Sequence, residues 1–234
     1  MLTFVSQAVR NFHHVGSVWP SSPRLAKALV KPILDRRGHD DRAPIKVLEV
    51  GAGTGAVTRT LLSALGPGDS ADIVELNPVF CESLERLARE RQSRVPGLDA
   101  RVHANPIEEA ELRGPYDFIV CGLPFNNFPP PLMRRIFRRM LSLLADGGTL
   151  TYFEYAGVRV ARSGVSTADT RKRLRRIEAV GKLLHRRLYG RRTLVLGNFP
   201  PAIAIQLQRR GTLPAKFVDA ALESDASPCG TGRN

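Results

Sequence analysis

The residues best suited to chemistry form a glycine-rich stretch after a short run of β-branched residues, Glu49-Val50-Gly51-Ala52-Gly53-Thr54-Gly55. Three alternating glycines permit a tight turn between a strand and a helix, and a close approach of the backbone to a ligand. The dinucleotide fingerprint has its third glycine three residues after the second, and a P-loop adds a lysine. This stretch has neither feature. It predicts a ligand-binding turn of another kind, and a strand-to-helix turn without a ligand is the alternative.

An acidic residue, Glu75, ends the next strand-like run. It stands about 20 residues beyond the last glycine, where a carboxylate in an open α/β sheet can accept hydrogen bonds from both hydroxyls of a ribose. The alternative is an ordinary solvent-facing acid at the end of a strand. The glycine stretch upstream favours a role in binding.

The elements that must position these residues alternate between strand-like and helix-like patterns from residue 45 onward. Strands are expected at 46–50, 72–76, 100–103, 118–121, 149–154, 193–196 and 202–207, and helices at 57–65, 78–91, 132–144 and around 174–188. Alternation of this kind predicts parallel strands with helices on both faces. The loop between the last two strands contains Pro200 and Pro201 and is too short for a helix, which predicts an antiparallel hairpin. The expected fold class is α/β, a Rossmann-like doubly wound seven-stranded mostly parallel sheet with a C-terminal antiparallel hairpin.

Three parts of the chain differ in pattern. Residues 1–42 precede the main domain and begin with an amphipathic helix, in which Val5, Val9 and Phe12 recur at helical spacing. Residues 43–210 form the α/β domain. Residues 211–234 are rich in Gly, Ser, Pro and Asp and are expected to be a flexible tail.

The pattern Glu49-x-Gly51-x-Gly53-x-Gly55 followed by Glu75 resembles the cofactor site of class I S-adenosylmethionine-dependent methyltransferases, over residues 45–208. The resemblance implies that the glycine loop, Thr54 included, lies along the methionine part of S-adenosyl-L-methionine. It implies that Glu75 holds the ribose, and that Glu49 acts near the methionine amino group through water or the loop backbone. Many members carry an acid after the third strand for the adenine amino group, and here Asn105 stands in the matching stretch.

After the fourth strand, Gly122-Leu123-Pro124-Phe125 resembles the Asn-(Leu/Pro)-Pro-(Tyr/Phe) motif that aligns the target amine in amino methyltransferases. Gly122 replaces the polar first residue, which argues against a planar nucleobase amine. Residues 15–22, Val-Gly-Ser-Val-Trp-Pro-Ser-Ser, strengthen a likeness to the bacterial phospholipid N-methyltransferases that convert phosphatidylethanolamine to phosphatidylcholine. In that family the N-terminal stretch caps the cofactor, so Ser21 and Ser22 are candidate contacts. Alternatively, they anchor a loop and cap a helix.

Methyl transfer needs no dedicated nucleophile, because the sulfonium methyl group is already activated. The protein must position a neutral amine and exclude water. The substrate ammonium must first lose a proton, and candidate bases are Tyr152, Tyr155, Glu154 and His103. An aromatic surround for a methylated ammonium is available from Trp19, Phe125, Tyr152 and Tyr155, although each of these side chains could instead pack in the core.

The net charge of +13 and the pI near 10.6 predict an anionic partner. Most of the excess lies between residues 159 and 192, and a second cluster is formed by Arg134, Arg135, Arg138 and Arg139. A solvated outer helix face is the alternative explanation. Charge alone does not choose between nucleic acid and an anionic membrane. The resemblance implies anionic membrane lipids and a phosphatidylethanolamine substrate, with nucleic acid only under a second hypothesis, an rRNA adenine N6-dimethyltransferase.

Other classes of protein fit less well. The three cysteines and five histidines lack the spacing of a disulfide scaffold or a metal site, so no metal is expected. No apolar run reaches the length of a membrane-spanning helix. We therefore expect a cytoplasmic enzyme, peripherally associated with the inner face of the cell membrane. A membrane-adhering binding protein that has lost catalysis is a third hypothesis.

Overall fold

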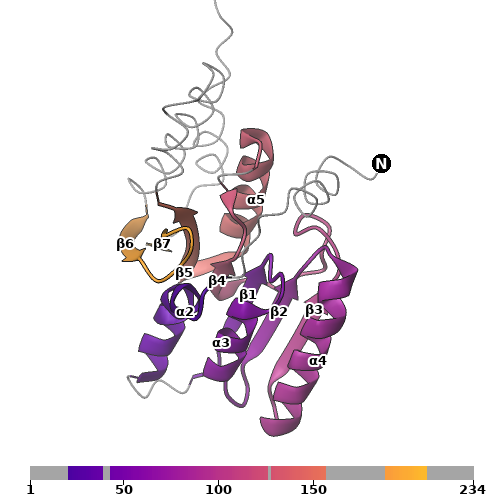
Figure 1. Ribbon diagram of the computed structural model, residues 1–234. Helices are drawn as coiled ribbons and strands as arrows, with labels where there is room; N and C mark the ends of the chain where they lie inside the picture. The colour runs from indigo at the N-terminus through magenta and orange to yellow at the C-terminus, as the bar shows by residue number, and fades with distance from the viewer. Residues whose placement is uncertain (1–20, 39–42, 126–127, 157–187, 210–234) are drawn as a thin grey trace, which may run out of the picture.

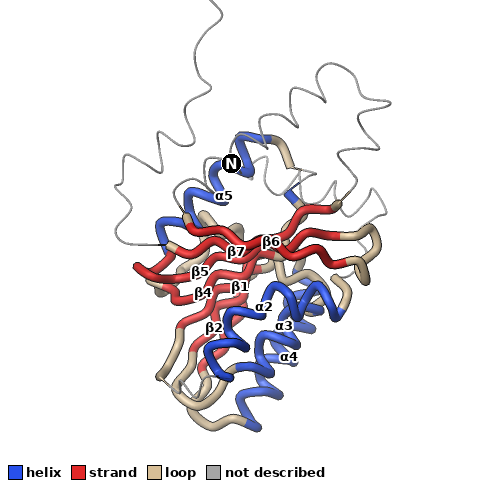
Figure 2. The backbone as a smooth tube through the Cα atoms, turned by 90° about the vertical axis from the view of Figure 1, so that its left-hand side faces the viewer, coloured by secondary structure: helices blue, strands red, loops and turns tan. Residues whose placement is uncertain are grey.

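The computed structural model describes residues 21–38, 43–125, 128–156 and 188–209. Within these residues lies a seven-stranded sheet of order β3-β2-β1-β4-β5-β7-β6 (Figures 1 and 2). Neighbouring strands pair in parallel from β3 to β5, and β7 is antiparallel to both of its neighbours. This topology confirms the predicted fold class. The strands are β1 (Lys46–Val50), β2 (Ser70–Val74), β3 (Asp99–His103), β4 (Tyr116–Cys121), β5 (Leu144–Tyr155), β6 (Tyr189–Val195) and β7 (Ala202–Gln208).

Helices cover both faces of the sheet. One face carries α2 (Pro23–Gly38), α3 (Ala56–Ala64) and α4 (Pro78–Arg94), and the other carries α5 (Pro130–Leu143), as Figure 2 shows. In α2 the buried side chains Leu25, Leu29 and Ile33 recur every four residues and join the core of the first face. In α5 the buried side chains Met133, Phe137 and Met140 recur at spacings of four and three residues and join the core of the second face.

Several predicted boundaries differ from the structure, and three of the strands illustrate why. The strand expected at 72–76 is β2, which begins at Ser70, where the backbone N–H donates to Ile45 O at 2.9 Å. The strand expected from residue 149 is β5, which already begins at Leu144, because the glycine-containing segment 144–148 belongs to the strand. The strand expected from residue 193 is β6, which begins at Tyr189. Arg191 and Arg192 are exposed in this edge strand, so its first half lacks the apolar pattern by which a strand is predicted.

The carboxyl ends of the parallel strands meet at one edge of the sheet, and backbone hydrogen bonds join the loops there. The Gly51 N–H donates to Val74 O at 2.9 Å, and the Gly122 N–H donates to Val50 O at 2.8 Å. The loop after β1 is therefore held between the ends of β2 and β4. This edge is where open α/β sheets bind ligands.

Several predicted features fall outside the described residues. They are the amphipathic helix before residue 21, the helix around 174–188, most of the basic stretch and the tail 211–234. None of the helices in the described ranges is long and apolar enough to cross a membrane. The same ranges contain no group of three or more His, Cys, Asp or Glu side chains placed to hold a metal ion.

Candidate active site

The glycine loop between β1 and α3 has the backbone that its sequence predicts. Gly51, Gly53 and Gly55 have φ values of 74°, 56° and 80°, in the left-handed region that side chains disfavour. A Cβ at Gly51 would collide with the side chain of Leu123, whereas one at Gly53 would meet no atom within 4 Å. Gly51 therefore serves close packing inside the protein, and Gly53 borders open space that a ligand can approach.

Glu75 joins the end of β2 to this loop. Its Oε2 accepts a hydrogen bond from the Gly53 N–H at 2.7 Å. Its Oε1 accepts from the N–H groups of Leu76 and Asn77, both at 2.8 Å. Each carboxylate oxygen can accept two hydrogen bonds, so Oε2 keeps capacity for a ligand hydroxyl beside the open space at Gly53. This arrangement fits a bound ribose.

Glu49 is buried beneath the same loop with an exposed fraction of 1%. Neither carboxyl oxygen makes a hydrogen bond to a described residue. Burial raises the pKa of Glu49 to about 8. The nearby Thr58 hydroxyl lowers this pKa, although it is not placed to form a hydrogen bond, and the negative charge of Glu75 raises it further. A buried polar group without a partner is rare in native proteins. A cationic group of a ligand, such as an amino group, would satisfy this carboxyl in its ionised form.

Gly122 begins the motif after β4, and the structure supplies a reason for the glycine. A Cβ at this position would lie 2.6 Å from the Gly51 carbonyl oxygen. No side chain fits there while the cofactor loop keeps its shape. Leu123 is half-buried against Gly51, and Pro124 is buried. Gly122 and Leu123 thus pack directly against the loop after β1, and we call residues 122–124 the wall of the site.

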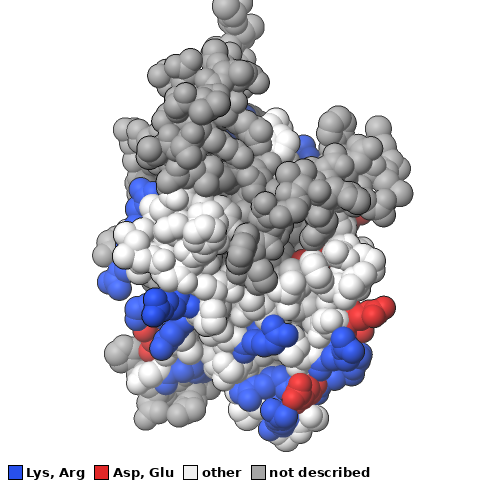
Figure 3. Space-filling view, in the orientation of Figure 1, with Lys and Arg blue, Asp and Glu red and all other residues white. Residues whose placement is uncertain are grey.

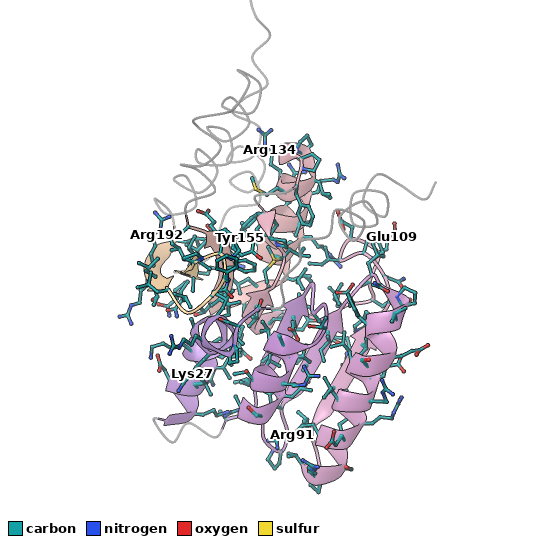
Figure 4. All side chains as sticks on the ribbon, viewed as in Figure 1. Lys27, Arg91, Glu109, Arg134, Tyr155 and Arg192 are labelled. Atoms are coloured by element: carbon teal, nitrogen blue, oxygen red, sulfur yellow. The ribbon has the colours of Figure 1, made fainter. Side chains whose placement is uncertain are left out.

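Two aromatic residues of the predicted amine site, Phe125 and Tyr152, lie in the core, and a third, Trp19, falls outside the described residues. Phe125 and Tyr152 are 2% and 3% exposed, and their ring centroids are 6.1 Å apart. Phe125 also packs against Phe137 with centroids 4.6 Å apart. Tyr155 is half-buried at the end of β5 and packs edge to face on Phe153 (Figure 4). The contact of these rings with a substrate amine stays a prediction.

The candidate bases differ in their surroundings. Burial and the charge of Glu154 raise the pKa of Tyr152, and burial raises the pKa of Tyr155, so both phenols keep their protons at neutral pH. His103 is engaged elsewhere, because its Nε2 lies 2.8 Å from Asp72 Oδ1. Glu154 is one-fifth exposed at the end of β5 and faces Arg192 at 3.8 Å. It is the carboxylate among the four candidates.

A buried polar network accounts for His103 and was not predicted. The Tyr116 hydroxyl donates to Asp72 Oδ2 at 2.7 Å and accepts from the Arg113 N–H at 2.9 Å. Burial alone would raise the pKa of Asp72, but His103, Tyr116 and Arg113 together lower it. An aspartate in the middle of an apolar strand is the signal that points to such a network. Asn105, the candidate adenine contact, is exposed in the loop after β3.

The two serines before α2 lie at the same edge of the sheet. The Ser22 Oγ accepts from the Leu25 N–H at 3.2 Å, which caps the helix. The Ser22 N–H donates to Asn198 Oδ1 at 3.0 Å, so the loop between β6 and β7 holds the start of α2. Ser21 is half-buried beside it. Ser22 therefore has the capping role, and the contact of both serines with the cofactor stays a prediction.

Comparison with known proteins agrees with this geometry. Residues 48–150 match the methyltransferase domain family. The ornithine lipid N-methyltransferase of Singulisphaera acidiphila is 30% identical over 147 residues, which are 62% of this chain and 73% of that protein. The hybrid PKS-NRPS synthetase lepA of Aspergillus flavus is 30% identical over 131 residues, 55% of this chain but 3% of that protein.

A solved structure shares the fold. The O-methyltransferase TomG of Streptomyces achromogenes, in complex with S-adenosylmethionine, superposes with a TM-score of 0.60 at 17% identity. The match covers 88% of this chain and 87% of that one. The left-handed glycine loop, the open space at Gly53, the remaining acceptor capacity of Glu75 and the unpartnered carboxyl of Glu49 all fit S-adenosylmethionine as the cofactor. The chain belongs to the class I S-adenosylmethionine-dependent methyltransferases.

Proposed function

We propose that the protein methylates the primary amine of a lipid headgroup, with phosphatidylethanolamine converted toward phosphatidylcholine as the expected reaction. The observation that carries the proposal is the likeness to a lipid N-methyltransferase, which this chain matches over 73% of its length. Ornithine lipid, the substrate in that relative's name, also presents an amine on a lipid. The shared chemistry is an amino group at a membrane surface, and the experiment below separates the two lipids.

The packing at Gly122 supports this proposal over methylation of RNA adenine. An RNA enzyme of the related kind places a polar side chain at the first motif position to hold the planar base amine. Here a Cβ at residue 122 would lie 2.6 Å from the Gly51 carbonyl oxygen. The space for a base-reading side chain is filled by the cofactor loop. A flexible aliphatic amine, which needs no planar recognition, is the better match.

In the proposed mechanism, bound S-adenosylmethionine supplies the activated methyl group, and the chain supplies position and a proton acceptor. Glu75 and the Gly53 N–H border the ribose side of the site. The wall formed by Gly122, Leu123 and Pro124 sets the position of the amine and excludes water. We assign the acceptance of the ammonium proton to Glu154, which stands at the end of β5 with its carboxylate one-fifth exposed.

Peripheral binding to an anionic membrane at the cytoplasmic face is part of the proposal. Arg135 and Arg139 of α5 reach the loop after β3, with Arg139 Nε 3.4 Å from Ile107 O. The face shown in Figure 3 carries Lys and Arg together with Asp and Glu. On α4 these charges form the exposed pairs Arg89–Glu85 and Arg94–Glu90. That helix is therefore a poor candidate for the membrane-facing surface.

The test is transfer of labelled methyl groups to vesicles that contain phosphatidylethanolamine, ornithine lipid or neither, with small-subunit RNA in a parallel reaction. Label in a lipid extract supports the proposal and identifies the lipid, whereas label in RNA alone overturns it. Glu75→Ala and Gly53→Val should abolish cofactor binding and turnover together. Glu85→Ala, which removes an exposed carboxylate of α4, is the matched control and should retain both. Unchanged turnover in Glu75→Ala would refute the assigned site.

A further inference from the structure

Exposed apolar side chains gather at the end of β6 and in the loop that follows it. Leu194, Leu196 and Phe199 are 57%, 72% and 72% exposed. Among the described residues, the other large hydrophobic side chain with comparable exposure is Val79 at the start of α4. Isolated exposed hydrophobics are ordinary, but three within six residues form a patch that marks an interaction surface. We call residues 194–199 the apolar tip.

The apolar tip stands on a fixed base. Asn198 is buried, with its Oδ1 accepting from the Ser22 N–H at 3.0 Å and its Nδ2 donating to Pro200 O at 2.8 Å. The Arg24 side chain lies so close to Gly197 that a Cβ there would collide with it. The loop backbone is therefore tied to the start of α2, and Leu196 and Phe199 are held outward from this base.

The apolar tip lies at the same edge of the sheet as the candidate active site. Val195 pairs with Ala202, which in turn pairs with Tyr155 at the carboxyl end of β5. The tip therefore continues the sheet beyond the end of β5, next to the proposed base Glu154. In Figure 1 the loop between β6 and β7 lies beside the start of α2, at the end of the sheet reached by β5.

The charge around the apolar tip is mainly positive, although Glu154 lies beside the tip and faces Arg192 at 3.8 Å. Residues 21–34 and 188–209 contain no Asp or Glu. They contribute the exposed basic residues Arg24, Lys27, Arg191 and Arg192, and Figure 4 shows Lys27 on α2 below the hairpin and Arg192 on the hairpin itself. An apolar wedge surrounded by cations matches the interface of an anionic bilayer, where apolar side chains enter the headgroup boundary and cations meet lipid phosphates. Three side chains are too few for the area that a stable protein interface buries.

We infer that the apolar tip inserts into the interface of an anionic lipid bilayer and brings the carboxyl edge of the sheet to the lipid headgroups. The choice of a lipid partner rests on the proposed function. Membrane contact through the tip does not require turnover, so the two ideas can fail separately. The inference also assigns Arg24 and Arg191 to contacts with lipid phosphates.

The test is co-sedimentation of the full chain with vesicles of phosphatidylethanolamine and phosphatidylglycerol, compared with vesicles that lack the anionic lipid. The double variant Leu196→Ser/Phe199→Ser should bind the anionic vesicles about tenfold more weakly or worse. Val79→Ser, with a side chain 68% exposed outside the tip, should bind like the wild type. Arg24→Gln/Arg191→Gln should weaken binding and reduce its dependence on salt.

Two further measurements separate the possible outcomes. Binding of S-adenosylmethionine to Leu196→Ser/Phe199→Ser, measured by calorimetry, should equal that of the wild type, which would show that the variant is folded. Its methylation of a detergent-dispersed lipid should also be unchanged, because the tip acts on the membrane and not on the amine. If Leu196→Ser/Phe199→Ser binds anionic vesicles as strongly as the wild type does, the inference is overturned. It is also overturned if the wild type does not bind anionic vesicles. A wild-type dimer that becomes a monomer in the variant would instead assign the tip to a second copy of the chain. If vesicle binding depends on the tip but no lipid is methylated, the proposed function is refuted and the inference about membrane binding still holds.

Discussion

The buried carboxyl of Glu49 leads to a quantitative prediction about stability. Burial raises its pKa from the usual 4.5 to about 8 in the folded chain, whereas the unfolded chain titrates near the usual value. Between these pH values the folded chain keeps the proton and the unfolded chain has released it. The free energy of unfolding therefore falls as the pH rises through this window.

The substitution Glu49→Gln removes this titration and nearly preserves the shape of the side chain. One pKa unit corresponds to about 1.4 kcal/mol. The titration should therefore lower wild-type stability by about 3 kcal/mol at pH 7, but by only about 1 kcal/mol at pH 5. Any packing effect of the amide is independent of pH. Relative to the wild type, the variant should gain about 2 kcal/mol in stability between pH 5 and pH 7.

The assay is urea unfolding of the cofactor-free chain, followed by circular dichroism at several pH values from 5 to 8. Glu85→Gln is the control, because its carboxylate is half-exposed and lies 3.3 Å from Arg89. Its stability should follow that of the wild type across the range. If the curve of Glu49→Gln also runs parallel to that of the wild type, the buried carboxyl does not hold its proton and the reasoning is refuted. The same variant should bind S-adenosylmethionine more weakly in calorimetry, since an amide cannot offer a negative charge.

Two other substitutions test the packing of the site. Gly122→Ala places a Cβ 2.6 Å from the Gly51 carbonyl oxygen and should weaken cofactor binding about tenfold or more in calorimetry. The control Gly66→Ala, whose Cβ meets no atom within 4 Å, should leave cofactor affinity unchanged. Equal affinities of the two variants would contradict the proposed wall. Tyr116→Phe removes the 2.7 Å hydrogen bond to buried Asp72 and should lower the free energy of unfolding by about 1 to 3 kcal/mol. Because the pKa of Asp72 is lowered in the folded chain, its contribution to stability is present above the usual aspartate pKa and is lost as the pH falls through the lowered value. The variant should therefore lose less stability on acidification than the wild type, and equal losses would show that the network does not set that pKa.

Local sequence patterns predicted most of the fold and the tight turn between β1 and α3. The tight turn at Gly51, Gly53 and Gly55 is recognisable from the sequence, because residues other than glycine avoid the left-handed backbone that these positions adopt. The alternation of strand and helix patterns was enough for the parallel sheet and its terminal hairpin. The position of Glu75 beside the glycine loop could be predicted because β1 and β2, which precede the loop and Glu75, are consecutive parallel strands that pair side by side.

The remaining features depend on contacts that leave no local pattern. Asn198 meets Ser22 across 176 residues of sequence, so neither residue signals the other. Phe125 and Tyr152 have the composition of an aromatic cage, but their burial depends on how α5 packs against the sheet. The start of β6 is exposed and basic, and a strand at the edge of a sheet needs no apolar alternation.

The contact between Gly51 and Gly122 has a consequence for how the two halves of the site vary and communicate. A Cβ on Gly51 would strike Leu123, and a Cβ on Gly122 would strike the Gly51 carbonyl oxygen. The loops after β1 and β4 therefore interlock, with no room for a side chain at either glycine. A shift of the first loop on cofactor binding would therefore also displace Gly122 and Leu123. Relatives that carry a side chain at one of these positions should show a compensating change at the other, and the pair should covary.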